Sequence, residues 1–246
     1  MWNKPHLLNA LADLLVLVAA AALLAAGAVW LVRVPALPIK QVMFAEALPH
    51  TRRGEVEQVL PASLKGNFFS LNLDVVRASL QTLPWVRKVD VRRIWPDKLE
   101  ISIEEHKPVA RWGEGRSELV NSFGEVFAAQ LPEEEGVGLP LLFGPNGTAQ
   151  EVLTHYGNFV QAFKTVGETP VQVTLSPRLA WQLKLQNGML VDIGREQTKA
   201  PVGVRLQRFI EIYPETVARQ AVRPAVVDLR YPNGFAMRVA GEGKGK

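Results

Sequence analysis

The longest hydrophobic pattern in the chain lies close to its amino terminus. Residues 14–32 carry no charged side chain, and an α-helix of that length extends roughly 28 Å, close to the thickness of the hydrocarbon core of a bilayer. The small residues of Ala26-Gly27-Ala28 also suit a signal-peptidase site, but the apolar run continues beyond them, and Lys4 is the single lysine or arginine before it. The pattern favours a membrane-spanning helix over residues 14–34, with a cleaved signal peptide as the alternative.

The next segment predicts one strand followed by two short amphipathic helices. The strand is expected over Ile39–Phe44. Thr51 and Asn72 each precede an apolar helical period, and both are residue types that accept hydrogen bonds at helix amino termini. Pro61 and Pro84 follow these periods and are expected to end the helices. The apolar side chains that would face a core are Val56, Val59 and Leu60 in the first helix and Val76, Leu80 and Leu83 in the second.

A β-hairpin is predicted next, in the run VRKVDVRRIWPDKLEISIEEHKP. Its hydrophobic residues recur with a period of two, as in half-buried strands. A five-residue loop over 94–98 pairs Val91 with Ile101, so that both apolar rows lie on one face of the hairpin. The same register sets Arg92 opposite Glu100 as a cross-strand pair. The recurring apolar residues are Val89, Val91, Leu99, Ile101 and Ile103.

From about Val109 onward the pattern changes to short strands and two longer helices. Gly124 and the Asn187-Gly188 pair mark hairpin turns, and residues 139–147 suit a strand that leads into a turn. Two helices are expected among these strands, and the second of them is expected to end at Pro214. Their apolar faces consist of Val152, Tyr156, Phe159, Val160 and Phe163 in the first helix and of Leu206, Phe209, Ile210 and Tyr213 in the second.

The last hairpin, over residues 226–239, is the segment most suited to binding a partner. A three-residue Pro-Asn-Gly loop would pair Tyr231 with Phe235 beside the turn. Arg230 and Arg238 would then face solvent, where each can pair with an acidic side chain of an incoming strand. The alternative is that the two aromatic rings only fill the core. The other expected pairs are Leu229 with Met237 and Val227 with Val239.

Composition narrows the classes of function. The chain has 48% hydrophobic and 21% charged residues, which is typical of a globular protein. It has no cysteine, which excludes disulfides and thiolate metal sites. The net charge is +4, and the basic pairs Arg52-Arg53, Arg87-Lys88 and Arg92-Arg93 raise nucleic-acid binding as an alternative. Acidic residues alternate with the basic ones in the hairpin, however, so a solvated face is the preferred interpretation.

Glu104-Glu105-His106 is the segment closest to a catalytic or metal-binding pattern. Neighbouring residues on a strand point to opposite faces, so only Glu104 and His106 share a side, and a metal would need further ligands. The sequence has no GxSxG, GxxxxGK[ST] or SxxK motif. We therefore predict no catalytic residue, no metal site and no cofactor, and keep an enzyme acting on the cell wall from a site near Glu104 and His106 as the alternative function.

The order strand, helix, helix, hairpin and the segment LPWVRKVDVRRIWPDKLEISIEEHKPVARW resemble the POTRA domain of the FtsQ/DivIB family of bacterial cell-division proteins. The resemblance continues in the order of the family through LVNSFGEVFA, LPLLFGPNG, VDIGRE, RLQRFIEIYP and VVDLRYPNGFA. With the patterns above, it implies an α+β fold class with a single transmembrane helix, a small β-α-α-β-β POTRA domain and a β-rich domain with flanking helices. The expected boundaries are 1–13 for a cytoplasmic tail, 14–34 for the transmembrane helix, 37–108 for the POTRA domain, 109–240 for the β domain and 241–246 for a flexible tail.

Charge alone does not decide the orientation of the helix, because Lys4 precedes it while Arg33 and Lys40 follow it. The resemblance implies a single-pass protein of the inner membrane at the division septum, with its amino terminus in the cytoplasm and its bulk in the periplasm. It also implies a non-enzymatic scaffold of the divisome. Such a scaffold contacts FtsB directly, binds the FtsB–FtsL pair, links early to late division proteins and helps control septal peptidoglycan synthesis by FtsW–FtsI.

The resemblance further implies which residues bind the partner. In the family the partner segment adds along the last strands of the β domain, near an arginine that follows a glycine and near an Arg-Tyr turn. Two positions depart from the family pattern. Asn233 occupies a position where the family usually has a serine, and Val239 lies roughly where it usually has a tryptophan. The matching positions here are Arg195, Arg230, Tyr231, Asn233 and Gly234, and the hairpin pattern adds Phe235.

Overall fold

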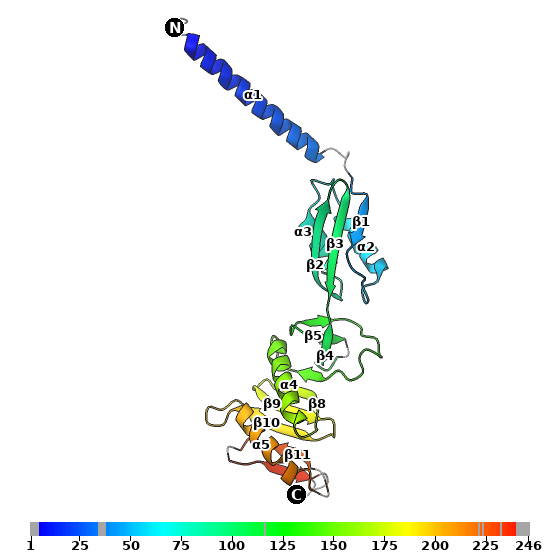
Figure 1. Ribbon diagram of the computed structural model, residues 1–246, viewed down its shortest axis with the longest axis vertical. Coiled ribbons are helices and arrows are strands. Elements are labelled where there is room, and N and C mark those ends of the chain that lie inside the picture. The colour runs from blue at the N-terminus through cyan, green and yellow to red at the C-terminus, as the bar shows by residue number, and fades with distance from the viewer. Residues whose placement is uncertain are drawn as a thin grey trace. The chain divides into compact units, whose positions relative to one another are not determined.

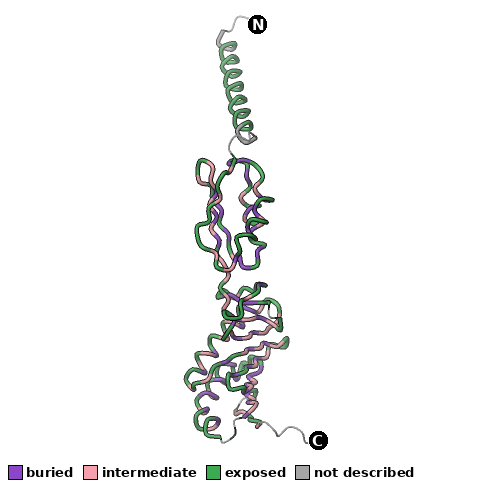
Figure 2. Tube along the Cα trace, turned by 90° about the vertical axis from the view of Figure 1, so that its right-hand side faces the viewer, coloured by how far each residue is buried: buried purple, intermediate pink, exposed green. Residues whose placement is uncertain are grey.

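The computed structural model describes residues 5–33, 38–115, 117–220, 222, 224–231 and 233–239. The chain divides into two compact units, Met1–Glu105 and His106–Lys246. The helix α1 spans Pro5–Arg33 and contains an apolar stretch of 23 residues from Leu8 to Trp30, none of it buried (Figures 1 and 2). At about 1.5 Å per residue this stretch is long enough to cross a membrane. The helix begins at Pro5, earlier than the predicted start of the span at residue 14. The predicted end of the span, residue 34, lies outside the described residues.

The first unit contains a three-stranded sheet packed against two helices. Its strands are in the order β1-β3-β2, with β1 parallel to β3 and β2 antiparallel to it. Side chains of both helices and of the two long strands form a single core, as the β-α-α-β-β pattern predicted. The elements are β1 (Gln41–Phe44), α2 (Arg53–Ser63), α3 (Leu73–Leu80), β2 (Val86–Ile94) and β3 (Lys98–Glu105) (Figure 1).

The β2–β3 hairpin has the predicted register. Val91 pairs with Ile101 and Arg92 with Glu100, and the Arg92 guanidinium donates a hydrogen bond to the Glu100 carboxylate. The turn is shorter than the loop predicted over 94–98, because the first and last residues of that loop pair with each other. The recurring apolar residues are buried, so the charged residues form the solvated face of the hairpin.

The amino-terminal ends of the two helices in this unit depend on different contacts. Asn72 caps α3 as predicted, because its side-chain oxygen accepts hydrogen bonds from two N–H groups of the first turn. The prediction that Thr51 caps α2 is wrong. The residue before that helix is Arg52, which forms no capping side-chain bond. Thr51 lies one residue earlier, and its N–H donates to the Glu105 carboxylate at 2.7 Å.

The predicted helix ends at Pro61 and Pro214 are also wrong. α2 continues past Pro61 to Ser63, and α5 (Val202–Thr216) continues past Pro214. A proline lacks an N–H and therefore removes one hydrogen bond to the carbonyl four residues earlier. Both prolines lie in the last turn of their helices, where the loss of one bond does not interrupt an otherwise packed helix.

Glu105 ties the end of β3 to the loop before α2. Its carboxylate accepts hydrogen bonds from the N–H groups of Thr51 (2.7 Å) and His50 (3.1 Å), and it lies 3.1 Å from Nδ1 of His50. Burial raises the pKa of Glu105, but the hydrogen bonds from Thr51 and His50 together lower it by more. The pKa of Glu105 in the folded protein is therefore below its ordinary value.

We expect Glu105→Gln to flatten the dependence of stability on pH in the acidic range. A carboxyl whose folded-state pKa is depressed stabilises the protein above its unfolded-state pKa of about 4.3, and this contribution is lost as the pH falls through the folded-state pKa. Urea unfolding of the wild type and the variant between about pH 3 and pH 6 measures the difference. Glu104→Gln is the control, and a Glu105→Gln curve parallel to that of the wild type would contradict the expectation.

The second unit contains a nine-stranded sheet and two helices within the described residues (Figure 1). The strand order is β12-β11-β10-β9-β8-β7-β4-β5-β6, with both parallel and antiparallel neighbours. Its elements in chain order are β4 (Pro108–Trp112), β5 (Glu118–Asn121), β6 (Val126–Ala128), β7 (Leu141–Phe143), α4 (Ala149–Lys164), β8 (Pro170–Leu175), β9 (Ala180–Leu185), β10 (Leu190–Arg195), α5, β11 (Pro224–Asp228) and β12 (Ala236–Val239).

The local predictions for this unit are largely confirmed. Gly124 lies in the hairpin between β5 and β6, and Asn187-Gly188 lies between β9 and β10. Residues 139–147 contain β7 and the turn that follows it. Of the predicted face of α4, Tyr156 and Val160 are only half-buried. The other members of that face and all four predicted residues of α5 are buried, namely Val152, Phe159, Phe163, Leu206, Phe209, Ile210 and Tyr213.

The register of the last hairpin differs from the prediction. β11 ends before Leu229, and Met237 pairs with Val227 instead. Leu229 is buried, and its N–H donates to the carbonyl oxygen of Asp192 on β10 at 2.7 Å. Because this contact draws Leu229 against β10, the connection to β12 covers residues 229–235, of which residue 232 lies outside the described residues. The predicted pairs of Tyr231 with Phe235, Leu229 with Met237 and Val227 with Val239 are therefore wrong.

Candidate partner-binding surface

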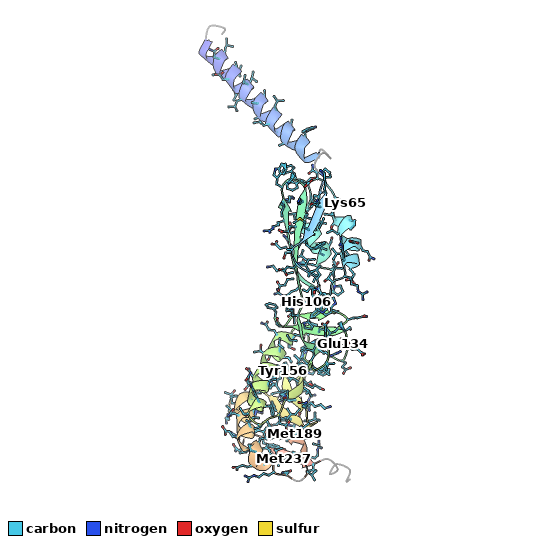
Figure 3. The ribbon with its side chains drawn as sticks, turned by 45° about the vertical axis from the view of Figure 1, so that its right-hand side comes forward. Lys65, His106, Glu134, Tyr156, Met189 and Met237 are labelled. Carbon is cyan, nitrogen blue, oxygen red and sulfur yellow. The ribbon has the colours of Figure 1, made fainter. Side chains whose placement is uncertain are left out.

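β12 is an outer strand of the nine-stranded sheet and the candidate site for an added strand. It pairs with β11, and within the described residues no strand pairs with its other side. Its residues, including Arg238 as predicted, are exposed or half-buried, and Figure 3 labels Met237 on this strand. Such an edge presents backbone N–H and C=O groups that can pair with an incoming strand.

The predicted partner-binding arginines gather at one end of this sheet. β10 and β11 run parallel, with Asp192 opposite Asp228, so the segments that follow the two strands leave the sheet at the same end. Arg195 is the exposed last residue of β10, and Arg230 follows β11 by two residues. The sheet thus brings together two arginines that lie far apart in the sequence.

Gly194 permits the close approach of Arg230 to the end of β10. Its φ is +82°, a conformation that glycine adopts without strain. A Cβ atom at this position would lie 2.8 Å from Cγ of Arg230. The register of β10 against β9 also shifts between Asp192 and Gly194. Glycine is therefore required at position 194 for two reasons, the positive φ of the backbone and the close approach of the Arg230 side chain.

Arg230 is held by Asp228. Its Nε donates to both carboxylate oxygens at 2.8 and 3.0 Å, its Nη2 donates to Oδ2 at 2.5 Å, and its backbone N–H donates to Oδ1 at 3.0 Å. The hydrogen bond between the side chains lowers the pKa of Asp228 and raises the pKa of Arg230. The side chain of Arg230 is nevertheless 62% exposed, so its guanidinium is accessible to a carboxylate of a partner.

Tyr231 and Phe235 occupy different environments. The Tyr231 side chain is 55% exposed, whereas Phe235 is half-buried and packs edge-on against Phe209 with ring centroids 5.5 Å apart. The alternative that both rings fill the core therefore holds only for Phe235. Asn233 is exposed and Gly234 is half-buried between them. A small pocket at this point is lined by Arg205, Arg208, Phe209, Leu229, Tyr231, Gly234 and Phe235.

Arg205, on α5, is buried next to this surface and was missed by sequence reasoning. It is only 2% exposed, and its Nη2 donates to the carbonyl oxygen of Arg195 at 2.5 Å. Its Nε and Nη1 are buried without a hydrogen-bond partner in the part of the chain that is described. Burial lowers the pKa of Arg205, and the charge of Glu196 opposes that shift. The helical periodicity could have identified Arg205 as buried, because Arg205 falls between Val202 and Leu206 on the apolar face of α5.

The arrangement is suited to an extended segment that carries acidic side chains. Arg195 and Arg230 are exposed, and Arg205 lies behind them with unused donors. Asp228 is engaged by Arg230, and the Glu196 carboxylate accepts the N–H of Val202 at 3.1 Å. A carboxylate of an incoming segment would accept charge-assisted hydrogen bonds from arginine, while the backbone of that segment pairs with β12.

Comparison with known proteins identifies both units. Residues 110–230 match the family described as "Cell division protein FtsQ/DivIB, C-terminal", and residues 37–106 match the "POTRA domain, FtsQ-type". The chain is 40% identical over 241 residues to the cell division protein FtsQ of Burkholderia pseudomallei, an alignment that covers 98% of this chain and 95% of that protein. The chain belongs to the FtsQ/DivIB family.

Further relatives extend the same result. The FtsQ protein of Bordetella pertussis is 34% identical across 98% of this chain and 93% of its own length, and that of Neisseria gonorrhoeae is 32% identical across 99% and 97%. FtsQ/DivIB proteins are non-enzymatic components of the divisome. Membership therefore gives this chain a role in cell division and in the protein–protein interactions of the divisome, and it confirms the α+β class with a POTRA domain followed by a β-rich domain.

The segment considered for catalysis has structural contacts. Glu104 forms an ion pair with Arg87 at 2.9 Å. His106 belongs to the second unit, where it stacks on Phe127 with centroids 4.2 Å apart and its Nδ1 lies 2.9 Å from Nδ2 of Asn121. Glu104 and His106 are thus engaged in different units. Among the described residues, no group of three or more His, Asp or Glu is placed to hold a metal ion.

The basic pairs considered for nucleic-acid binding are partly neutralised by acidic neighbours. Arg87 pairs with Glu104, and Arg53 pairs with Glu57 at 2.9 Å. Arg92 pairs with Glu100 across the hairpin. These pairs support the interpretation of a solvated face over that of a surface for phosphate groups.

Proposed function

We propose that this chain is a membrane-anchored scaffold that binds the FtsB–FtsL pair and links early to late proteins of the divisome. Through this pair it helps control septal peptidoglycan synthesis by FtsW–FtsI. The observation that carries the proposal is the open edge of β12 beside the exposed residues Arg195 and Arg230, with Arg205 buried against the carbonyl oxygen of Arg195. The FtsB segment pairs its backbone with β12, and its acidic side chains contact Arg195 and Arg230. Tyr231, Asn233, Gly234 and Phe235 border the same segment.

The proposal includes the topology of the chain in the membrane. α1 is an uncleaved anchor, residues 1–13 lie in the cytoplasm, and both the POTRA domain (37–108) and the β domain (109–240) lie in the periplasm. The tail expected over residues 241–246 lies outside the described residues. The apolar length of α1 supports this arrangement. We expect a reporter that is active only in the periplasm to be active when fused after residue 246, and an inactive but intact fusion would contradict this topology.

Replacing Arg230 and Tyr231 together with alanine tests the binding surface. We expect about tenfold weaker binding of an FtsB periplasmic segment, because the change removes an exposed guanidinium and an exposed ring beside β12 and corresponds to about 1.4 kcal/mol of binding free energy. Affinity would be measured by titration with the purified chain. Both side chains are largely exposed, so the urea midpoint should change little.

The matched control is the double variant Lys184→Ala and Phe123→Ala. It also removes one exposed cation and one exposed ring, but Lys184 lies within β9 and Phe123 lies beside β6 at the opposite edge of the sheet. This variant should bind as the wild type does. Unchanged binding by a correctly folded Arg230/Tyr231 variant would overturn the assignment of the site.

A further inference from the structure

The turn of the β2–β3 hairpin presents an aromatic ring to solvent. Trp95 is 73% exposed, although the residue before it and the residue after Asp97 are paired in the sheet. The indole of tryptophan has a large apolar surface and one N–H donor. An exposed ring of this kind at the tip of a rigid hairpin suits an interface that is apolar on one side and wet on the other.

Cationic side chains surround this turn. Lys40 and Arg93 are exposed and Lys98 is half-buried. Asp97 is the acidic residue of the turn, and it is paired with Lys40 at 3.3 Å. Arg93 donates to the carbonyl oxygen of Leu71 at 2.6 Å. Because a carbonyl group has no net charge, this hydrogen bond does not neutralise the positive charge of Arg93. The turn therefore carries more positive than negative charge.

The turn also lies close in the chain to the end of α1. The N–H of Lys40 donates to the carbonyl oxygen of Asp97 at 2.9 Å, so the turn is joined directly to the start of β1. Only seven residue steps separate Lys40 from Arg33, the last residue of α1. A fully extended chain covers at most about 25 Å over seven steps. If α1 crosses a membrane, the turn is thus confined near the membrane surface at any orientation of the first unit.

We propose that this turn is a membrane-contact site for an anionic lipid surface. Trp95 enters the headgroup region, and Lys40, Arg93 and Lys98 interact with lipid phosphates. Tryptophan is enriched at this depth of a bilayer, and basic residues near an anionic surface add to the attraction. The tether keeps the turn at a high effective concentration beside the lipid, so a single ring is sufficient for contact. The inference rests on the proposed anchoring by α1.

Contact at two points would restrict the orientation of the POTRA domain. Anchoring by α1 alone would provide one point of attachment and would not set the direction of the β2–β3 hairpin relative to the membrane. A second contact through the turn would set the β2–β3 hairpin against the membrane. The opposite end of the hairpin, where β2 begins, would then lie farther from the bilayer by about the length of β2, roughly 26 Å.

The absence of cysteine allows a direct test with single spin labels in the full-length protein. Gln41→Cys places a nitroxide on an exposed residue opposite Lys98 without altering the turn. The protein would be reconstituted in bilayers with and without phosphatidylglycerol in phosphatidylcholine. Accessibility to oxygen and to a water-soluble nickel complex reports the depth of the label. We expect headgroup depth in anionic bilayers and a shift toward water when Trp95→Ala is added.

Two further labels separate the possible failures. Gln81→Cys, at the end of α3 that precedes β2, should be aqueous in every sample, and Ala20→Cys within α1 should be deep in the bilayer. An aqueous Gln41 label together with a deep Ala20 label would overturn the contact and leave the anchor intact, as would a Gln41 label unaffected by Trp95→Ala. An aqueous Ala20 label would overturn the anchor and the contact with it. Equal depth in both lipid mixtures would overturn the role of the three cations.

Discussion

Replacing Phe209 with alanine is expected to lower the free energy of unfolding of the second unit by about 3–5 kcal/mol. Phe209 is buried on α5 and is the central ring of a row, with centroids 5.5 Å from Tyr213, 5.5 Å from Phe235 and 6.4 Å from Phe163. Its loss removes apolar burial and leaves a cavity beneath the segment that follows β11. Urea unfolding measures the change.

The same variant should weaken partner binding even where it is fully folded, because Phe235 loses the ring against which it packs. Phe159→Ala is the matched control, since Phe159 is equally buried but packs on α4 against Trp181. We expect similar losses of stability for the two variants and loss of binding only for Phe209→Ala. Equal binding by both folded variants would show that the support of Phe235 is not needed for the partner.

Arg205→Met is expected to raise the free energy of unfolding by about 1–2 kcal/mol and to weaken binding of the FtsB segment about tenfold or more. Methionine fills a similar volume without the cost of a buried charge whose Nε and Nη1 lack partners. The hydrogen bond to the Arg195 carbonyl is lost, which reduces the gain in stability. The partner loses the cation behind its acidic side chain. Urea unfolding and titration measure the two effects.

Opposite signs of the two effects distinguish a functional from a structural arginine. Lys184→Met controls for the loss of one positive charge, because Lys184 is an exposed residue of β9. It should leave both quantities nearly unchanged. A loss of stability in Arg205→Met together with unchanged binding would show that the guanidinium serves the fold alone, and the partner would then be held by Arg195 and Arg230.

The elements that could be predicted were those specified by residues close together in the sequence. The β2–β3 register followed from alternating apolar residues and a short turn, because a shift by one residue would turn Val91 and Ile101 toward solvent. The hairpin at Asn187-Gly188 followed from the frequency of that pair in tight turns, where Gly188, though not Asn187, has a positive φ of +89°. The apolar faces of α4 and α5 followed from helical spacing.

The errors arose where a distant residue competes with a local preference. Thr51 has the chemistry of a helix cap, but α2 begins one residue too late for it, and a hydrogen bond from the Thr51 N–H to Glu105 of β3 ties Thr51 to the sheet. Pro61 and Pro214 are unfavourable inside helices, but the packing of α2 and α5 extends each helix beyond its proline. Local propensity was overridden by tertiary contacts in each case.

The candidate site was only partly accessible to sequence reasoning. The positions Arg195, Arg230 and Tyr231 were inferred from a family resemblance, and the parallel pairing of β10 with β11 is what brings the arginines to one end of the sheet. The predicted pairing of Tyr231 with Phe235 failed because Leu229 bonds to β10. Arg205 was overlooked because the apolar face of α5 was defined by its hydrophobic residues alone. A charged residue on that face is found only when the position of every residue of α5 on the helix is considered.

The sequence by itself determined the apolar helix, the first hairpin, the helical faces and the family, since each depends on spacing along a continuous stretch of chain. Only the tertiary structure decided which strand is an edge, where the last hairpin turns and which arginine is buried without a partner. These features depend on contacts between β10, α5 and the segment after β11. Such contacts are set by the packing of distant segments, which periodicity within one segment does not encode.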